Sequence, residues 1–368
     1  MDGLRLLLVI LLILHGLIHL MGFAKSYKLA ELPQLTQAIP RLLGIPWLCT
    51  ALLLLASAVM FTVGRDIWWI PASAALMLSQ VLIILAWSDA KFGTVVNVML
   101  LVFVLLGYGA WSFRSLVEAN RTALLSGVGN EQRIVTEESV ASLPPVIRKW
   151  LTRSNVVGKE SIRTARLHQT GEMRTSKEGK WMPFRADQWI TSARPGFLWQ
   201  VRVIAGPGMV IYGMDNYAEG RGRMLMKVLA LYAAVDARGP ELDQGAMIRY
   251  LSEIIWVPST ALSPCLQWRQ VDSSTAEATM SYGGITATGR FTFDANGDPT
   301  GFTAKRYFYR ESGSTLEDWV IRSPAEGFRE FDGVRIPSRS TVSWALKDGE
   351  YTWLKLEVTD LRINKTDQ

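Results

Sequence analysis

Four long apolar runs in the first 113 residues constrain this chain more than any other feature. The first run carries one charge, Arg5 near its start, and the other three carry none. The runs are Leu4–Phe23, Pro46–Val63, Ile67–Trp87 and Phe92–Phe113, each 18 to 22 residues long. About 20 apolar residues in a helix cross a hydrocarbon core about 30 Å thick, and soluble helices rarely repeat such runs without charges. The sequence therefore predicts a four-helix transmembrane domain over residues 1–113.

The remaining residues have the composition of an ordinary soluble domain. Of the chain's 39 basic and 33 acidic residues, only six and four lie in residues 1–113, which leaves 33 and 29 in residues 114–368. A stretch of this length is long enough to bury a core of its own. Residues 114–140 are mostly polar and contain two glycines, so they are expected to form a linker or the fraying end of the last span. The soluble domain is then expected over residues 141–368.

From Ser161 onward, runs rich in Val, Ile, Thr and aromatic residues alternate with turn residues such as Gly283-Gly284. This pattern is typical of strands joined by short turns, which pair in antiparallel fashion. The expected strands are 161–173, 181–192, 197–204, 208–213, 222–230, 266–271, 275–282, 285–294, 300–310, 315–322, 334–346 and 351–363. Because strands as long as 334–346 favour strong curvature, the predicted fold class is α+β. Its centre is a curved antiparallel sheet, or half-barrel, covered by helices.

Two helices are predicted beside this sheet. The first begins at Pro144-Pro145 and places Val146, Ile147, Trp150 and Leu151 on one face. This face either docks on its own domain or lies on anionic headgroups. The second helix, Glu241–Ile255, places an Arg249–Glu253 pair opposite an apolar face. That face consists of Met247, Ile248, Leu251, Ile254 and Ile255. We expect the second helix to plug or cover the concave side of the sheet.

Motifs for covalent, metal or phosphate chemistry are missing from the sequence. It contains no GxSxG motif and no phosphate-binding loop, and Cys265 has no nearby His or Lys. His15 and His19 lie one helical turn apart in the first apolar run. They either serve a haem, a metal or a proton relay, or pack as neutral imidazoles hydrogen-bonded to neighbouring helices. Because no other run contains a histidine, packing is favoured, and no catalytic residue, metal ligand or cofactor is predicted.

Several motifs in combination resemble a family of uncharacterised bacterial multi-span membrane proteins. They include the run from His15 to Phe23 (HGLIHLMGF), Ser88–Val96 (SDAKFGTVV), Leu143-Pro144-Pro145, Trp181–Phe184 (WMPF) and Trp256-Val257-Pro258. The family is a domain of unknown function, so the resemblance implies little chemistry. Its soluble part is similar in element order to the LolA/LolB/LppX superfamily. That similarity implies a curved sheet closed by helices over an apolar cavity that holds acyl chains or lipids.

Aromatic residues give the sequence its candidate site. Residues 114–368 contain nine tryptophans, many alternating with polar residues on expected strands. They either fill an ordinary sheet core or line an apolar pocket under the helix 241–255. The residues predicted to line such a pocket are Trp189, Trp199, Met247, Leu251, Ile255, Trp256 and Trp344.

Three functions fit these observations. The leading hypothesis is a non-catalytic, membrane-anchored module of the bacterial envelope that binds or handles a lipid or a lipoprotein. The alternatives are a membrane-bound sensor or assembly factor that binds a protein partner, and a membrane-bound enzyme. Acidic residues interrupt the basic ones, so no nucleic-acid partner is expected. The bilayer is the expected partner, with the chain integral to the cytoplasmic (inner) membrane. The basic residues of loop 24–45 favour a cytoplasmic location for that loop. With four spans, the soluble domain then lies on the opposite, extracytoplasmic side.

Overall fold

The computed structural model describes residues 2–129, 131–310 and 313–365. The chain divides into two compact units. The helical unit extends to Ser115 and also includes the short segment Leu229–Leu231. The β-unit begins at Leu116 and contains the remainder. The dividing point lies inside one helix, α5, and not at the start of an irregular linker.

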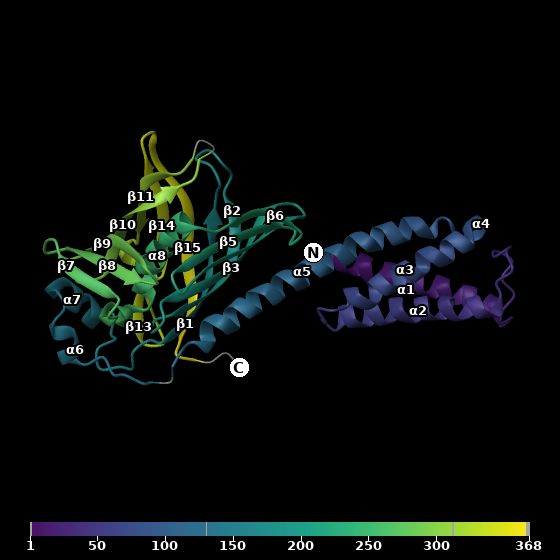
Figure 1. Ribbon diagram of the computed structural model, residues 1–368, viewed down its shortest axis with the longest axis horizontal. Coiled ribbons are helices and arrows are strands. Elements are labelled where there is room, and N and C mark those ends of the chain that lie inside the picture. The colour runs from purple at the N-terminus through teal and green to yellow at the C-terminus, as the bar shows by residue number, and fades with distance from the viewer. Residues whose placement is uncertain (1, 130, 311–312, 366–368) are drawn as a thin grey trace. The chain divides into compact units, whose positions relative to one another are not determined.

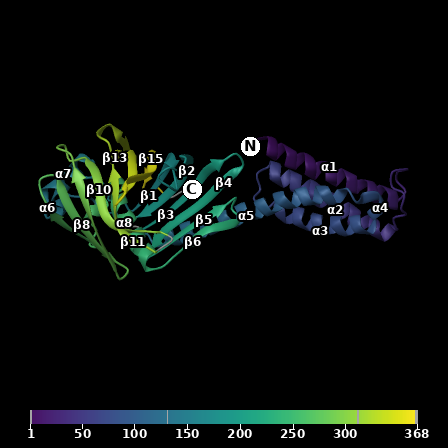
Figure 2. The same ribbon diagram turned by 90° about the horizontal axis from the view of Figure 1, so that it is seen from above.

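The helical unit packs its helices around a small apolar core (Figures 1 and 2). Its elements are α1 (Asp2–Ser26), α2 (Arg41–Thr62), α3 (Trp69–Leu85), α4 (Trp87–Ala90) and the first part of α5 (Gly93–Ser126). Leu12, Leu54, Ala72 and Leu100 are fully buried, one from each long helix. Three segments are long and apolar enough to cross a membrane: Gly3–Ser26, Arg41–Thr62 and Gly93–Ser126.

The prediction of four membrane-spanning helices was wrong for the third run. The helix there, α3, has only 17 residues, which is about 26 Å of helix against a core of about 30 Å. It ends because Ala86 leaves the helical conformation (φ −112°, ψ 38°), and Trp87 begins the separate short helix α4. The absence of charge across 67–87 did not reveal this break in the backbone.

The two histidines of α1 belong to the interior of the helical unit. His15 Nε2 lies 2.9 Å from Asn97 Oδ1 on α5 and 3.2 Å from Ser79 Oγ on α3. His19 Nδ1 lies 2.9 Å from the carbonyl oxygen of His15. Hydrogen bonds between neighbouring helices are the contacts expected of packed, neutral imidazoles.

The segment predicted as a linker or as the fraying end of the last span is helical over its first half. Helix α5 continues to Ser126, and its last turns belong to the β-unit, where Asn120 Oδ1 accepts a hydrogen bond from Asn216 Nδ2 at 3.3 Å. The short helix α6 (Glu137–Ala141) follows, capped by Thr136, and then α7 (Pro145–Arg153). The apolar face of α7 is buried in the core of the β-unit, where Trp150 stacks on Phe291. It docks on its own domain, as one of the two alternatives predicted.

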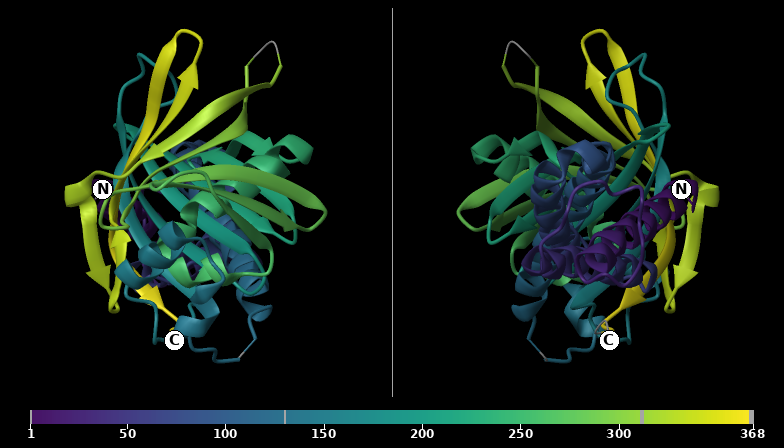
Figure 3. Two further views of the ribbon diagram at one scale, coloured as in Figure 1. Left: turned by 90° about the vertical axis from the view of Figure 1, so that its left-hand side faces the viewer. Right: turned by 90° about the vertical axis from the view of Figure 1, so that its right-hand side faces the viewer.

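The β-unit is built on one antiparallel sheet of 13 strands that curls into a half-barrel (Figure 3). Its order is β6-β5-β4-β3-β2-β1-β15-β14-β11-β10-β9-β8-β7. The strands are β1 (Thr164–Met173), β2 (Met182–Thr191), β3 (Gly196–Gly206), β4 (Met209–Ala218), β5 (Arg221–Val228), β6 (Tyr232–Ala237), β7 (Leu266–Gln270), β8 (Thr275–Tyr282), β9 (Ile285–Phe293), β10 (Pro299–Phe308), β11 (Thr315–Arg322), β14 (Arg339–Leu346) and β15 (Gly349–Ile363). The first and last strands, β1 and β15, pair in the middle of the sheet.

The structure differs from the predicted strands at several places. β4 continues to Ala218, past the predicted end at residue 213, and neither β6 nor the short strand β12 was predicted. The strand predicted over 222–230 ends at Val228 because Leu229 and Ala230 adopt positive φ angles of 53° and 60°. The long strand predicted over 334–346 is two strands. β13 (Val334–Pro337) pairs with β12 (Phe328–Phe331) in a small separate sheet, and β14 joins the large one. The break follows Pro337, which has no N–H to donate to a ladder.

Helix α8 (Pro240–Glu253) lies inside the curve of the large sheet, between strands β6 and β7 of the sequence (Figures 1 and 2). Two short 3-10 turns follow it, η1 (Ile254–Trp256) and η2 (Pro258–Leu262). The buried side chain of Asp243 ties the start of α8 to β5. Its carboxylate accepts hydrogen bonds from the backbone N–H of Gly222 at 2.7 Å and from Arg221 Nη1 at 2.9 Å. The predicted helix over 241–255 is thereby held against the concave face.

Candidate functional site

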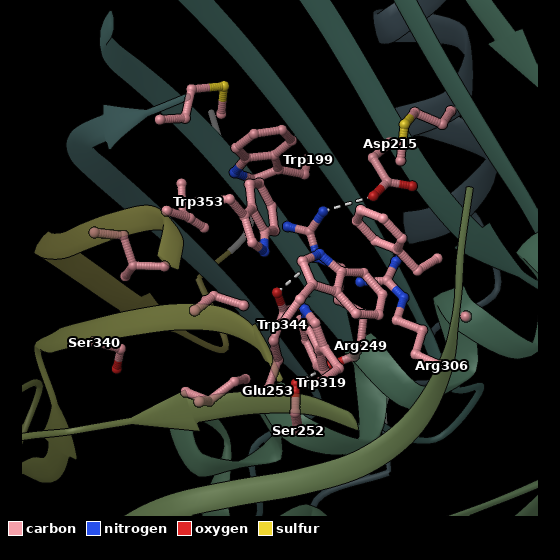
Figure 4. A pocket seen from close by; sticks show the side chains of 18 of the residues that line it. Trp199, Asp215, Arg249, Ser252, Glu253, Arg306, Trp319, Ser340, Trp344 and Trp353 are labelled. Carbon is pink, nitrogen blue, oxygen red and sulfur yellow. Dashed lines mark hydrogen bonds and ion pairs between the residues drawn. The ribbon is translucent and has the colours of Figure 1, made fainter. Parts of the chain in front are cut away.

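A cavity of about 430 Å³ lies between α8 and the concave face of the sheet (Figure 4). Ligand pockets in proteins typically enclose about 300–1,000 Å³. Strands from both halves of the sheet contribute to its wall, from β5 on one side to β10 on the other. The cavity therefore exists only because the sheet curls around the helix.

Most side chains of the wall are apolar. They are Met173, Phe184, Trp199, Met224, Met226, Leu242, Ile255, Trp256, Phe308, Trp319, Ile321, Val342, Trp344, Tyr351, Trp353, Leu354 and Leu356, together with the aliphatic parts of polar neighbours. The two-residue period of a strand explains the arrangement on β14, where Ser340, Val342 and Trp344 face inward while Ala345 is exposed.

One side of the cavity carries a buried ion-pair network centred on Arg249 of α8. Its Nη1 donates to Asp215 Oδ2 of β4 at 2.7 Å, and its Nε donates to Glu253 Oε1 at 2.8 Å. The guanidinium carbon also lies 4.7 Å from the ring centre of Phe197 and 4.8 Å from that of Trp199. Two carboxylates and two aromatic faces thus surround the guanidinium of Arg249.

Two glutamines extend this network along the sheet. Gln188 Nε2 donates to Glu253 Oε2 at 2.5 Å, and Gln169 Nε2 donates to Gln188 Oε1 at 3.0 Å. Trp199 Nε1 closes the chain by donating to Gln169 Oε1 at 2.9 Å. A chain of satisfied amides in a buried position rigidifies the wall on which it lies.

Burial dominates the titration of Glu253 and raises the pKa of its carboxyl above the usual value, although Arg249 and Gln188 favour the charged form. Burial also opposes the charge of Arg249, but the carboxylates of Glu253 and Asp215 outweigh it and raise the pKa of that guanidinium. Arg249 therefore keeps its charge, whereas Glu253 is pushed toward its neutral form.

Arg306 of β10 is a second buried arginine of the wall, and its surroundings differ. Arg306 is only 9% exposed, and its guanidinium forms no hydrogen bond or ion pair with another residue that the structure describes. Its contact is with the face of Trp319, 4.8 Å from the guanidinium carbon to the ring centre. Burial lowers the pKa of Arg306 to about 10, against the attraction of Asp215.

Gly245 of α8 makes room for Arg306. A Cβ atom added to Gly245 would lie 3.0 Å from Arg306 Nε, closer than ordinary packing allows. Glycine inside a helix costs about 1 kcal/mol relative to alanine. Because Gly245 has no side chain, the guanidinium of Arg306 can lie directly against α8.

The structure brings four of the seven predicted pocket residues to the cavity and leaves three outside it. Trp199, Ile255, Trp256 and Trp344 line the wall. The three that lie elsewhere are Trp189, Met247 and Leu251.

The register explains the misplacement of Trp189. Trp189 pairs with Leu198, whereas Trp199 pairs with Gln188. Since side chains directly opposite each other share a face, Trp189 points to the face opposite Trp199. There its ring packs against Arg166 of β1 and Arg121 of α5.

Helix α8 presents the other face to the cavity from the one predicted. Met247 and Leu251 are fully buried in the packed core. The residues of α8 that line the cavity include Gly245, Arg249 and Glu253. The apolar face was correctly expected to be buried, but it is buried against close-packed core, and the pocket was therefore assigned to the wrong face.

Sequence reasoning did not select Arg306 or Asp215, although a signal for Arg306 exists. Phe302, Ala304 and Arg306 follow the two-residue period of β10, and the first two face the core. An arginine on the same strand face as two core residues is unusual, because charged side chains are rarely buried without a partner. Such a position is a candidate for a functional residue. Its proximity to α8 could not be read from that pattern.

The histidine of the β-unit lies outside this site. His168 Nδ1 lies 2.6 Å from Asp187 Oδ1 on the neighbouring strand, and both side chains are more than one-third exposed. Neither residue lines the cavity.

A family of proteins of unknown function, DUF6544, matches residues 133–356 of this sequence. The chain belongs to the DUF6544 family. Membership of an uncharacterised family, expected from the sequence motifs, is thereby confirmed. No curated protein matches the chain.

Two solved structures match part of the chain. One is a DUF1329 family protein from Desulfovibrio piger, 9% identical, with a TM-score of 0.30 over 61% of this chain and 92% of that one. The other is a β-barrel-like protein of the domain of unknown function DUF1849 from Brucella abortus. It is 9% identical, with a TM-score of 0.20 over 56% of this chain and 99% of that one.

Proposed function

We propose that this DUF6544 protein is a membrane-anchored module that binds a lipid or an acyl chain in the cavity of its β-unit. The observation that carries the proposal is the cavity itself, about 430 Å³ with a mostly apolar wall. Close-packed protein interiors contain few voids larger than a water molecule. A void of this size lined by aromatic and aliphatic side chains suits an apolar ligand far better than water.

A non-catalytic role is part of the proposal. The carboxylates of Asp215 and Glu253 are the acidic groups nearest Arg249, and both are held by it at 2.7 and 2.8 Å. A general base needs a free, positioned lone pair and a substrate group within reach. One oxygen of each carboxylate is held by Arg249, which favours a structural part in the wall over proton transfer, although Asp215 Oδ1 has no hydrogen-bond partner among the described residues. The resemblance of the sequence to the LolA/LolB/LppX superfamily implies the same role, since a curved sheet around a helix suits the holding of an acyl chain.

The helical unit supports membrane attachment. Three of its helices are long and apolar enough to cross a bilayer. We propose the bacterial cytoplasmic membrane as the location, with the β-unit extracytoplasmic, and no nucleic-acid partner. A reporter fused after the last residue should then be active outside the cytoplasm. Activity only in the cytoplasm would reverse the orientation but would leave the cavity's role untouched.

The test of binding is native mass spectrometry of the full chain, extracted in a mild detergent, for a co-purified amphiphile. Val342→Phe places an aromatic ring in the cavity and reduces its free volume. Ala345→Phe places the same ring on the exposed face of the same strand, β14. We expect wild type and Ala345→Phe to retain bound lipid and Val342→Phe to lose it without a large fall in melting temperature. A wild type without ligand, or equal retention by both variants, would count against binding in the cavity. A protein partner instead of a lipid is the alternative that such a result would favour.

A further inference from the structure

Three arginines line the same cavity, Arg174, Arg249 and Arg306, and only Arg249 has carboxylate partners. Arg174 donates instead to the backbone carbonyl oxygens of Thr352 and Lys177. Arg249 is held by Asp215 and Glu253, whereas Arg306 contacts only the face of Trp319 among the residues described. Figure 4 shows the guanidinium groups of Arg249 and Arg306 beside the cavity, with dashed contacts from Arg249 alone. A buried charge is ordinarily paired, because leaving water without a counter-charge is costly. Arg306 is therefore a cation without its expected partner.

The neighbouring carboxylates do not supply that partner. No oxygen of Asp215 or Glu253 comes within ion-pair distance of the Arg306 guanidinium in the described structure. Burial moves the pKa of Glu253 upward, toward the neutral acid. Three arginines of the wall, Arg174, Arg249 and Arg306, face three acidic residues, Asp215, Glu241 and Glu253. A shift of Glu253 toward its neutral form therefore leaves an excess of positive charge in the wall. The field of the cavity on this side is then positive.

Unused hydrogen-bond donors accompany Arg306. The indole N–H groups of Trp319 and Trp353, both from wall residues, have no acceptor among the residues that the structure describes. A planar guanidinium offers a fork of N–H donors that matches the oxygens of a carboxylate or phosphate. The donors left over in this wall thus have the chemistry of an anion site, next to an apolar surface.

We propose that the ligand of this cavity is an amphiphile with one acyl chain and an anionic head, whose carboxylate or phosphate oxygens accept hydrogen bonds from Arg306. The inference rests on the proposed function and specifies the class of its ligand. The chain lies along the apolar wall formed by β14 and β15, which contribute Val342, Trp344, Leu354 and Leu356. A volume of about 430 Å³ is near the lower end for ligand pockets, which favours one chain over several.

The test compares ligands that differ only in the head or only in the chain. The full-length protein, stripped of endogenous lipid in a non-ionic detergent, is incubated with hexadecanoate, hexadecanol or butyrate, and binding is measured by native mass spectrometry. Charge-assisted hydrogen bonds in a buried site correspond to about a 10- to 100-fold preference. We expect hexadecanoate to bind about 10- to 100-fold more tightly than hexadecanol, and butyrate to bind least.

Variants locate the preference. Arg306→Gln removes the buried charge, and Lys305→Gln removes a charge from the adjacent residue, which faces outward and pairs with Asp318 at 3.0 Å. Arg306→Gln should bind hexadecanoate and hexadecanol about equally, while Lys305→Gln keeps the wild-type preference. Should Arg306→Gln fold poorly, Arg306→Lys keeps the charge but not the fork, and should retain part of the preference.

The outcomes separate this inference from the proposed function. If wild type binds hexadecanol as tightly as hexadecanoate, or Arg306→Gln keeps the preference, the anionic head is wrong and acyl-chain binding stands. If butyrate binds as tightly as hexadecanoate, the site takes a small anion and the amphiphile is wrong. If none of the three compounds binds, the proposed function itself fails. A phosphate head in place of the carboxylate is tested by the same comparison with hexadecyl phosphate, whose tighter binding than hexadecanol supports the inference equally.

Discussion

Two buried arginines in one cavity provide a sharp test, because their replacement by methionine should change stability in opposite directions. Methionine approximates the volume of the arginine stem without its charge. Arg306 has no ion-pair partner among the described residues, while Arg249 holds two carboxylates. Removing an unpaired buried charge should stabilise the fold, and removing the partner of two buried carboxylates should destabilise it.

The pKa of Arg306 sets the size of the first effect. A fall from 12.5 to about 10 corresponds to about 3 kcal/mol against the charged form. Loss of the contact with Trp319 offsets about 1 kcal/mol of that gain. We therefore expect Arg306→Met to stabilise the unliganded protein by about 1–2 kcal/mol, or about 2–6 °C in melting temperature for a unit of this size. The pKa of Arg306 lies well above 8 in both the unfolded and the folded chain, so the gain in stability should be the same from pH 6 to 8.

Arg249→Met should act in the opposite sense. It leaves Asp215 and Glu253 buried without their cation, which typically costs about 3–5 kcal/mol. Lys305→Met, on the exposed face of β10, is the matched control and should stay within about 0.5 kcal/mol of wild type.

Thermal melts of the full chain, followed by tryptophan fluorescence after delipidation, measure all three variants. Delipidation is needed because a bound anion would neutralise Arg306 and also stabilise wild type by mass action. An Arg306→Met protein that melts at or below the wild-type temperature would refute the reasoning, since it would mean that the guanidinium is compensated in the unliganded cavity.

Four further outcomes are expected. Leu251→Trp should lower stability by about 1–3 kcal/mol, because Leu251 is fully buried in close-packed core; an unchanged melting temperature would show that space is available there. Trp189→Ala should cost about 3 kcal/mol and leave ligand retention unchanged, as its ring lies outside the cavity; loss of bound lipid from a variant that still folds would contradict that placement. Burial raises the pKa of Glu253, so this group's contribution to stability is complete below pH 4.5 and is lost as the pH rises through the raised value. The melting temperature of Glu253→Gln relative to wild type should therefore increase as the pH rises above 4.5, and a pH-independent difference would speak against it. A fragment starting at Leu116 should be soluble and unfold cooperatively, because the β-unit has its own core; an aggregated fragment without a melting transition would place the boundary elsewhere.

Local patterns were sufficient wherever a property depends on neighbours in the chain. The apolar runs indicated membrane-compatible helices. Runs rich in β-branched and aromatic residues, separated by turn residues, indicated most strands of the large sheet to within a few residues. These properties follow from side-chain period and hydropathy, which a short window of sequence contains. Where the backbone changed direction without a change in composition, as at Ala86 or after Pro337, the same window predicted one element in place of two.

The cavity, by contrast, depended on tertiary structure. Whether a buried side chain meets packed core or empty space depends on how far the sheet curls and on which face of α8 turns toward it. Leu251 and Arg249 lie two residues apart on α8, yet one is in the core and the other lines the cavity. The meeting of Asp215, Arg249 and Arg306 joins strands on both sides of the helix, and long-range pairing of β1 with β15 holds those strands in place. Sequence determined that these side chains would be buried or exposed. Only the curl of the sheet decided which of them share a cavity, because that curl is a property of the whole sheet and not of any single strand.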